Sequence, residues 1–368
     1  MLKVLIGDIF ESRAQTLMNT VNCEGVMGKG IALEFKKRFP EMFKEYVANC
    51  KAGVVKPGIL TIHQNLFQNE KIINFPTKKH WRSPTLIKDI EDGLDYFVEH
   101  YKEWGVSSVA IPPLGCGNGG LSWDAVGPLI YSKIKDLEID ITLFAPFGTN
   151  QDKLSIDFLK NNLNLNNKEK GNYLRGVVNE NEVLILETLY RLQQRIYAKP
   201  IGRIMFQKVC YILTETGAPT YLNFVENSYG PYSESAKKSL TILANNNLTI
   251  EDKVGGMFRT RITSEYLKLR KEKADLIEKN EKYIAKTVDL VSRIKDTDQG
   301  EEVATVMYAA KKLESQRNSV PVDTDVLKYI FDWKKDWKKE AKKQSSLLEI
   351  VEGLTMMGWI NVTLSESV

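Results

Sequence analysis

The chain has 368 residues, of which 43% are hydrophobic and 27% charged, and this size and composition predict a globular protein of more than one domain. No stretch approaches the roughly 20 apolar residues of a membrane span, and the opening MLKVLIGDIF is typical of a strand and not of a secretory signal, so we expect a cytoplasmic protein without a membrane partner. A net charge of +4 is too small to predict nucleic-acid binding from the overall charge. The four cysteines show no CxxC spacing that would indicate a metal site or a disulfide framework.

The first half of the chain alternates short apolar strands with amphipathic helices. Leu2–Ile6 predicts a buried parallel strand that ends at Gly7-Asp8, and the residues from there to Gly30 predict a turn and a glycine-rich loop. A helix is expected from Gly30, with Pro40 near its end. Further elements are predicted as strands at Ile59–His63 and Lys71–Phe75, a helix at Pro84–Trp104, a strand at Ser108–Pro112, a helix at Ser122–Lys135 and a strand at Ile139–Phe144. This order predicts a three-layer α/β/α sandwich with its site at the carboxyl ends of the strands.

The second half of the chain has a different pattern. A polar, asparagine-rich stretch predicts a linker over 156–175, between a domain at 1–155 and a second domain at 176–368. Because mostly helical segments run into one short β element, the second domain is expected to be a winged-helix-like α+β module. Helices are predicted at Glu182–Ile196, Gly202–Thr214, Ser233–Leu243, Ser264–Lys295 and Ser345–Gly358, and a strand at Trp359–Leu364.

Two glycine-rich loops in the first domain indicate a phosphate-binding site. The first spans Asn19–Ala32 and opens a helix, and the second, Pro113–Leu121, lies between a buried strand and a helix. Glycines let the backbone approach a ligand closely, and the amides at a helix N-terminus favour an anion. One such loop by itself is more often a structural turn. Two in one domain favour a diphosphate held from both sides by backbone N–H groups.

Four ordered motifs resemble a known family. GDIF at 7–10, NTVNCEGVMGKGIALEFKKRFP at 19–40, NFPTKKHW at 74–81 and IPPLGCGNGGLSW at 111–123 are similar to the ADP-ribose-binding macrodomain, and within it to the DarG family of macrodomain antitoxins and the related terminal ADP-ribose protein glycohydrolase. DarG antitoxins reverse the DNA ADP-ribosylation made by the toxin DarT. The resemblance covers about residues 1–150 and implies a macrodomain fold there.

The resemblance also implies roles for individual residues. Asp8 is expected to bond the adenine amino group, Ile9 to line the adenine pocket and Asn22 to face the distal ribose. Phe144 and Phe147 are candidates for packing on the adenine, although core packing explains them at least as well. The remaining predicted ADP-ribose-binding residues are Gly28, Lys29, Gly30, Ile31, Thr77, Gly115, Cys116, Gly117, Asn118, Gly119, Gly120 and Leu121.

Lys78 matches the lysine on which glycohydrolase activity depends in this branch, so the resemblance implies that it is catalytic. Paired lysines are otherwise usually solvated surface residues. A neutral Lys78 could attack the anomeric carbon, whereas a charged one could steady the departing thymine anion. The sequence leaves these alternatives open.

The second loop departs from the pattern of the protein glycohydrolase. That enzyme carries a catalytic aspartate at the position that corresponds to Gly119 here, and no carboxylate lies between Pro113 and Trp123. This favours a lysine-led mechanism that uses the substrate's own phosphate or a bound water. Glu24 is a second candidate for the general base, although a solvated loop carboxylate is the simpler interpretation.

The segment from Lys78 to Arg82 combines cations with aromatic rings, which is the mixture that single-stranded nucleic acids bind. We expect Trp81 or His80 to stack on the modified thymine or a neighbouring base, while Lys79 and Arg82 contact phosphates. A surface loop whose tryptophan packs on the domain is an equally good interpretation.

The sequence therefore predicts an antitoxin with two activities. The first domain is expected to hydrolyse the N-glycosidic bond of ADP-ribosylated thymidine in single-stranded DNA, with no cofactor and no metal. The resemblance implies that the second domain binds and neutralises the DarT-type DNA ADP-ribosyltransferase toxin, and YGPYS at 229–233 weakly resembles an antitoxin-associated domain called Panacea. Trp333 and Trp337 are predicted to form an apolar stripe on one basic helix. The alternatives are a non-catalytic ADP-ribose-binding reader and a purely protein-binding antitoxin.

Overall fold

A computed structural model describes residues 1–64, 70–161, 174–254, 257–317 and 319–365. The chain forms two compact units, Met1–Val177 with Leu240–Asn246, and Val178–Ser239 with Asn247–Val368. Most of the predicted linker, residues 162–173, lies outside the described residues. Its first six residues form a helix instead, α5 (Ile156–Asn161), because Leu159 is fully buried against the core of the first unit.

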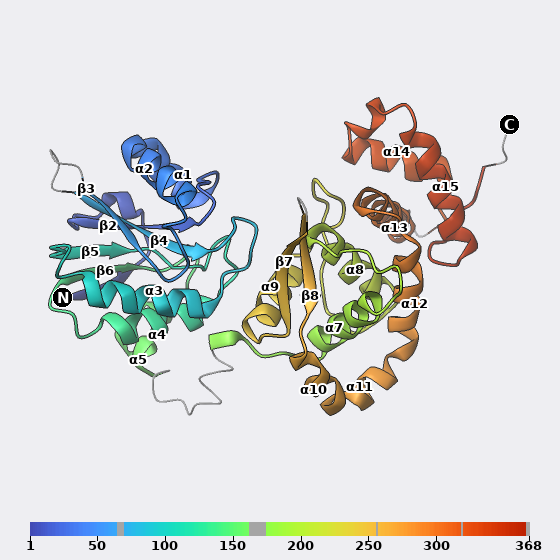
Figure 1. The fold of residues 1–368 in the computed structure, drawn as a ribbon. Helices are drawn as coiled ribbons and strands as arrows, with labels where there is room; N and C mark the ends of the chain where they lie inside the picture. Colours follow the sequence, from blue (N-terminus) through green and yellow to red (C-terminus); the bar gives the residue numbers. More distant parts are fainter. Residues whose placement is uncertain (65–69, 162–173, 255–256, 318, 366–368) are drawn as a thin grey trace. The chain divides into compact units, whose positions relative to one another are not determined.

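The first unit is a six-stranded mixed sheet covered by helices on both faces (Figure 1). The strand order is β1-β6-β5-β2-β4-β3, and every pair is parallel except β3 with β4. The strands are β1 (Leu2–Leu5), β2 (Thr16–Asn22), β3 (Thr61–Gln64), β4 (Lys71–Lys78), β5 (Ser108–Ile111) and β6 (Asp140–Phe144). The predicted three-layer α/β/α fold is confirmed.

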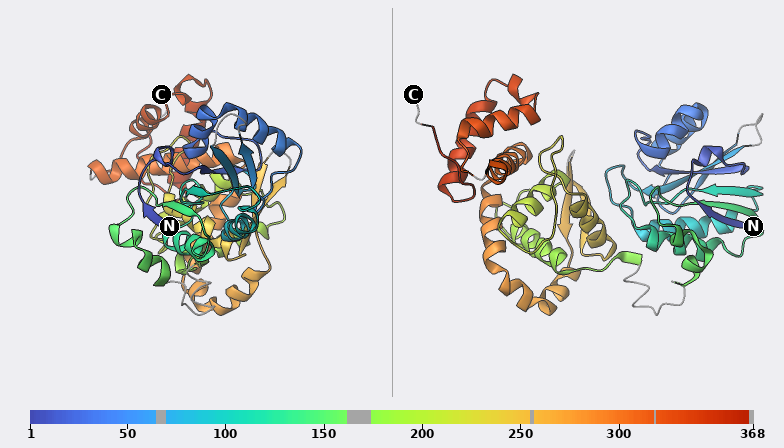
Figure 2. Two further views of the ribbon diagram at one scale, coloured as in Figure 1. Left: turned by 90° about the vertical axis from the view of Figure 1, so that its left-hand side faces the viewer. Right: turned by 180° about the vertical axis from the view of Figure 1, so that it is seen from behind.

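Both faces of this sheet carry helices and a hydrophobic core. Helices α1 and α2 lie on one face and α3, α4 and α5 on the other (Figure 2). On the second face, Gly93 of α3 allows the helix to approach β4, because a Cβ at Gly93 would lie 2.4 Å from the Phe75 ring. The helices before α5 are α1 (Gly30–Arg38), α2 (Pro40–Lys51), α3 (Ile87–His100) and α4 (Trp123–Ile134), with short 3-10 helices η1 (Ile9–Glu11) and η2 (Gln151–Leu154).

The prediction was wrong at the central strand β2, which we expected to be part of a turn and loop. Its sequence, TLMNTVN, is polar at positions that proved to be buried. Asn19 is fully buried, and its Nδ2 donates to Oδ1 of Asn74 on β4 at 3.0 Å. A strand that buries paired amides shows no continuous apolar run, which is the signal for a buried parallel strand. The helix expected from Gly30, α1, does end just before Pro40, at Arg38, and Pro40 begins a second helix, α2, at a position where proline is favoured.

The described residues after Val177 are mostly helical, as expected, and contain one antiparallel hairpin. Three helices followed by the β7–β8 hairpin have the element order of a winged-helix module. The elements are α7 (Glu180–Gln193), α8 (Arg203–Glu215), α9 (Glu234–Asn245), β7 (Thr249–Val254), β8 (Met257–Ile262), α10 (Glu265–Glu272), α11 (Ala274–Lys279), α12 (Glu281–Arg293), α13 (Thr297–Arg317), α14 (Asp323–Trp333), η4 (Trp337–Lys339) and α15 (Lys343–Met356).

Three predictions in this region were wrong. The β element is the β7–β8 hairpin and not Trp359–Leu364, where Trp359 and Ile360 are buried but only Thr363 forms an isolated bridge. The long helix expected at Ser264–Lys295 is divided into α10, α11 and α12. The helix expected to carry both tryptophans ends at Trp333, and Trp337 belongs to η4. Periodicity could not place these boundaries, because packing against other helices decides where each helix stops.

A buried lysine makes the stability of the second unit dependent on pH. Lys208 is 1% exposed and donates to the Pro231 carbonyl at 2.9 Å. Burial lowers its pKa from 10.5 to about 7; the charge of Lys334 adds to this and Glu301 opposes it. Between these values the unfolded chain binds more protons than the folded one, so stability rises with pH over that range.

We therefore expect the free energy of unfolding to increase from pH 7 to pH 9 by on the order of 2 kcal/mol more in the wild type than in Lys208→Met. Urea unfolding of both proteins at the two pH values measures this difference. An equal pH dependence in the two proteins would contradict the assignment to Lys208.

Candidate functional site

The carboxyl ends of three strands bring the two glycine-rich loops and Lys78 together. Lys78 ends β4, and its Nζ donates to the backbone oxygen of Asn118 in the second loop at 2.6 Å. The Nδ2 atom of Asn118 lies 3.5 Å from the position that a Cβ would take on Gly30, at the start of α1. The structure thus places the predicted catalytic lysine beside both predicted diphosphate loops.

The first loop is shaped by the Asn22 side chain. Its Oδ1 accepts hydrogen bonds from the backbone N–H groups of Glu24 at 2.9 Å and Val26 at 3.4 Å, and its Nδ2 donates to the Val26 carbonyl at 2.5 Å. The Tyr46 hydroxyl donates to the Asn22 backbone oxygen at 2.7 Å. Asn22 therefore holds the loop in its turn, and the contact expected between Asn22 and the distal ribose stays a prediction.

The end of the first loop has the geometry of an anion site. Helix α1 begins at Gly30, and among the described residues no side chain caps its first N–H groups. The flanking residues Gly28 and Lys29 are exposed, and Ile31 is half-buried. Free amides at a helix N-terminus attract negative charge, so this end of the loop suits a phosphate group.

Two glycines of the second loop differ in what surrounds them. Gly117 is exposed, and no described atom lies within 4 Å of the position of a Cβ there. At Gly119 a Cβ would lie 2.2 Å from the Gly115 carbonyl oxygen and 2.4 Å from Thr85 Oγ1. The fold therefore has no steric need for glycine at 117, where a ligand can approach, but excludes every side chain at 119.

The exclusion at Gly119 explains the missing aspartate in structural terms. The turn is closed by hydrogen bonds from Leu121 N to Gly115 O at 3.1 Å and from Thr85 N to Gly119 O at 3.2 Å. A carboxylate could not be accommodated at 119 without opening that turn. The other predicted loop residues, Cys116, Gly120 and Leu121, lie in the same turn.

Residues around Lys78 fix the end of β4. The Thr77 hydroxyl donates to the Val21 carbonyl at 3.4 Å, and Cys23 N donates to the Lys79 carbonyl at 3.2 Å.

Burial raises the pKa values of the Cys23 and Cys116 thiols to about 12. Both cysteines are therefore protonated at neutral pH and are poor nucleophiles.

The residues expected near the adenine differ in whether the structure exposes or buries them. Asp8 is exposed and caps η1, with its Oδ1 accepting from Phe10 N at 3.0 Å, whereas Ile9 is buried in the core. Phe144 is also buried in the core, but Phe147 is 82% exposed. Core packing thus explains Phe144, and of these two phenylalanines only Phe147 is available to an adenine ring.

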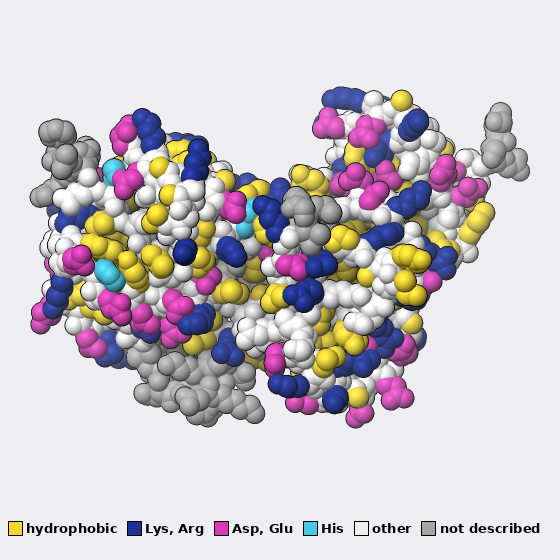
Figure 3. Space-filling view, viewed as in Figure 1, with side chains coloured by type: hydrophobic (Ala, Val, Ile, Leu, Met, Phe, Trp, Pro, Cys, Tyr) yellow, Lys and Arg dark blue, Asp and Glu magenta, His cyan; other side chains and the backbone are white. Residues whose placement is uncertain are grey.

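The segment after Lys78 displays aromatic and basic side chains. Trp81 is 46% exposed, the Arg82 guanidinium lies 4.4 Å from its ring centroid, and the His80 ring lies 5.4 Å from it. Lys79 is exposed beside them. An exposed tryptophan that already stacks on a guanidinium suits a base and its phosphate. On the face drawn in Figure 3, basic and acidic side chains are interspersed.

One carboxyl group near the site was missed in the sequence. Asp89 lies in the first turn of α3, and burial, with the charge of Asp92, raises its pKa to about 6. The charge of Asp89 raises the pKa of the Cys23 thiol, as does that of Glu24, whereas the charge of Lys79 lowers it. The available signal was an acidic residue in the first turn of the helix that follows the lysine segment. Glu24, the fallback base, is exposed.

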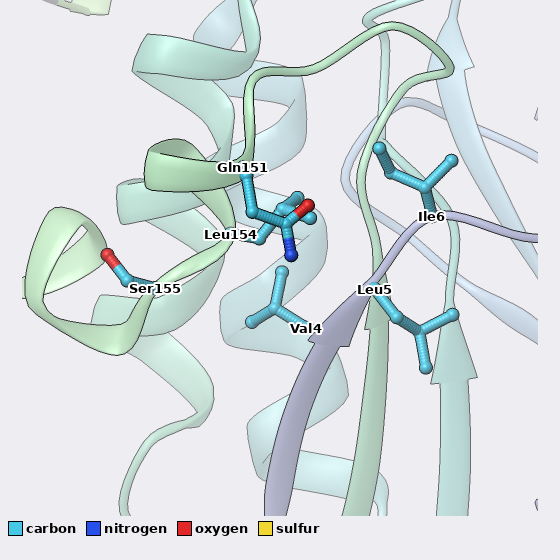
Figure 4. A pocket seen from close by; sticks show the side chains of 6 residues that line it. All are labelled: Val4, Leu5, Ile6, Gln151, Leu154 and Ser155. Carbon is cyan, nitrogen blue, oxygen red and sulfur yellow. The ribbon is translucent and has the colours of Figure 1, made fainter.

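A separate cavity of about 530 Å³ lies beside strand β1 (Figure 4). It contains none of the predicted site residues and is lined by Val4, Leu5, Ile6, Gln151, Leu154 and Ser155. Across the described ranges no cluster of three or more His, Cys, Asp or Glu side chains could hold a metal ion. None of the helices in those ranges is long and apolar enough to cross a membrane.

Comparison with protein families matches residues 18–130 to the macro domain. A DNA ADP-ribosyl glycohydrolase of Mycobacterium tuberculosis is 37% identical over 244 residues, which are 64% of each chain. Its counterpart in Thermus aquaticus is 37% identical over 237 residues, 64% of this chain and 61% of that one. This chain therefore spans less than two thirds of the length of these curated relatives.

A fusion protein of Thermosipho africanus, named DNA ADP-ribosyl transferase-DNA ADP-ribosyl glycohydrolase, is 40% identical over 162 residues, 39% of this chain and 42% of that one. Among solved structures, the macrodomain of Mycobacterium tuberculosis DarG is 44% identical and matches 40% of this chain and 98% of that one, with a TM-score of 0.39. The macrodomain of Thermus aquaticus DarG is 42% identical and matches 40% and 99%, with a TM-score of 0.38.

Proposed function

Because the first unit of this chain belongs to the macro-domain family, we propose that the chain is a DNA ADP-ribosyl glycohydrolase. It hydrolyses the N-glycosidic bond between ADP-ribose and thymine in single-stranded DNA and restores the unmodified base. The observation that carries this proposal is the amine of Lys78, held 2.6 Å from the Asn118 carbonyl beside the two glycine loops. The names of the relatives from Mycobacterium tuberculosis and Thermus aquaticus support the same activity.

Lys78 acts at the sugar end of a diphosphate that the loops hold. In one route the neutral amine attacks the anomeric carbon, a C–N bond to Lys78 forms, and the bond to thymine breaks with its electron pair going to the base. The base takes up a proton, and water then displaces the lysine to release ADP-ribose. In the other route, water attacks directly and the ammonium stabilises the departing base.

The principal alternative is a reader that binds ADP-ribose without cleaving it, since a cradle alone provides affinity and no rate. Incubating the full chain with an ADP-ribosylated thymidine oligonucleotide separates the two functions. Release of ADP-ribose with recovery of the unmodified oligonucleotide supports hydrolysis. Tight binding without release would establish the reader.

The second unit is proposed to bind and neutralise a DarT-type DNA ADP-ribosyltransferase. The alignments with relatives from Mycobacterium tuberculosis and Thermus aquaticus are longer than the first unit and so extend into the second. The alignment with the Thermosipho africanus fusion, which carries a transferase in the same chain, covers only 39% of this chain. This difference supports a second unit that recognises a separate transferase.

Co-expression of the transferase with full-length Lys78→Ala tests this partner role and the purely protein-binding alternative together. Protection of growth by the inactive variant supports direct neutralisation. Protection by the wild type alone would assign the antitoxin effect to hydrolysis.

Trp81 is proposed to contact DNA and not the ADP-ribose group. Because base stacking contributes roughly 1–3 kcal/mol, Trp81→Ala should weaken binding of an ADP-ribosylated oligonucleotide about 5-fold to 160-fold and leave the Kd of free ADP-ribose unchanged. Calorimetry with Lys78→Ala as the background prevents turnover during the titration. An equal loss of affinity for both ligands would contradict the DNA contact.

A further inference from the structure

Asn118 touches two other parts of the site at once. Its backbone oxygen accepts the hydrogen bond from Lys78 Nζ at 2.6 Å. Its side-chain Nδ2 lies beside the first loop, 3.5 Å from where a Cβ on Gly30 would be. The side chain is exposed, so this arrangement is not explained by core packing. One residue thus joins the end of β4, the second loop and the start of α1.

The carbonyl of Asn118 is held in place by the turn around it. Gly120 N donates to the Gly117 carbonyl at 3.2 Å, and Thr85 N donates to the carbonyl of Gly119 at 3.2 Å. No side chain fits at Gly119, because the backbone next to Asn118 packs closely against the Gly115 carbonyl oxygen and Thr85. A fixed carbonyl gives a fixed direction to any donor that it holds.

Lys78 needs such an acceptor, because its amine ends a flexible four-carbon stem with considerable rotamer freedom. The residue is only 8% exposed, so the stem is packed, and the hydrogen bond to the Asn118 carbonyl gives the amine at its end a direction. Displacements of about 1 Å at a reacting group cost on the order of 100-fold in rate. Turnover therefore depends on where the Lys78 amine points.

We propose that Asn118 is the positioning residue of Lys78: its backbone carbonyl holds the amine, and its side chain, which lies beside Gly30 of the first loop, keeps that carbonyl in place, so that loss of the side chain displaces the amine. This inference rests on the proposed glycohydrolase function. Binding of a diphosphate against the amides of α1 would then be transmitted through Asn118 to the amine. Asn118 contributes to turnover and little to affinity.

The test compares Asn118→Ala with the wild type and with Asn150→Ala, a control at an exposed asparagine of the same unit whose side chain caps no helix. Turnover of an ADP-ribosylated thymidine oligonucleotide should fall about 10-fold or more in kcat in Asn118→Ala. KM and the Kd of ADP-ribose should stay within about threefold, and Asn150→Ala should match the wild type. A change in Kd with an unchanged kcat would make Asn118 a binding residue and overturn the proposal.

A second measurement does not depend on turnover. In the protein with ¹³C-methylated lysines, the Lys78 signal is identified by its loss in Lys78→Arg. That signal should shift in Asn118→Ala and on addition of ADP-ribose to the wild type, while remaining unchanged in Asn150→Ala. An unmoved Lys78 signal in Asn118→Ala would overturn the positioning role even if kcat falls. Absence of turnover in the wild type would instead remove the proposed function, and the spectra would still decide whether Asn118 orients the amine.

Discussion

Lys78→Ala is expected to lower the turnover of an ADP-ribosylated thymidine oligonucleotide by about 100-fold or more. Both routes use the amine at the anomeric carbon or at the departing base, and loss of one such group commonly costs 10²-fold to 10³-fold. The Kd of free ADP-ribose should change less than about threefold, because the loops supply the diphosphate contacts. Single-turnover assays with calorimetry on the same preparations measure the two quantities separately.

Lys51→Ala is a matched control for this experiment, since Lys51 is an exposed lysine on α2 outside the site. It should leave both turnover and affinity unchanged. Retention of wild-type turnover in Lys78→Ala would show that the amine has no part in the reaction. A parallel loss of ADP-ribose affinity would show that Lys78 is primarily a binding residue.

Gly119→Ala is expected to disrupt the second loop. The added Cβ would lie 2.2 Å from the Gly115 carbonyl oxygen, which is backbone and cannot rotate away. Overpacking of this kind costs about 3 kcal/mol when the backbone must shift. We expect thermal unfolding of the first unit to begin at a clearly lower temperature, and ADP-ribose binding to weaken at least about 10-fold, because the turn presents the diphosphate amides.

Gly117→Ala separates the effect on stability from the effect on ADP-ribose affinity. No described atom lies within 4 Å of the new Cβ, so its unfolding temperature should match that of the wild type. Affinity for ADP-ribose should nevertheless fall, because the methyl group enters space that the ligand uses. Equal stability of Gly119→Ala and Gly117→Ala would contradict the steric argument, and unchanged affinity in Gly117→Ala would place the diphosphate elsewhere.

These two glycines also constrain how catalysis works here. A loop aspartate at 119 is sterically excluded, so the proposed reaction depends on Lys78 together with the substrate phosphate or a water. Asp89 is the titratable carboxyl that the structure adds, with its pKa raised to about 6 by burial. Its place on α3 near Cys23 makes it a second group to vary once the lysine has been tested.

The sequence by itself determined much of the first unit. Apolar runs such as Ser108–Ile111, and the spacing of the two glycine loops, depend on local residue order, and they predicted the layered fold and a diphosphate site, whereas the role of Lys78 was implied only by the family resemblance. Local order was not sufficient for β2, where Asn19 and Asn74 bury their amides against each other. It also missed the β7–β8 hairpin.

Only the tertiary structure decided how the site is assembled. Lys78 and Asn118 are 40 residues apart, yet the amine and the carbonyl meet at 2.6 Å because β4 and β5 flank β2 and end at one edge of the sheet. The space at Gly119 is closed by the nearby Gly115 carbonyl oxygen and also by Thr85, which is far from it in sequence. The sequence specifies which chemical groups are available to the site. The distances between those groups are set by contacts between distant segments, because these segments come together only when the strands pair.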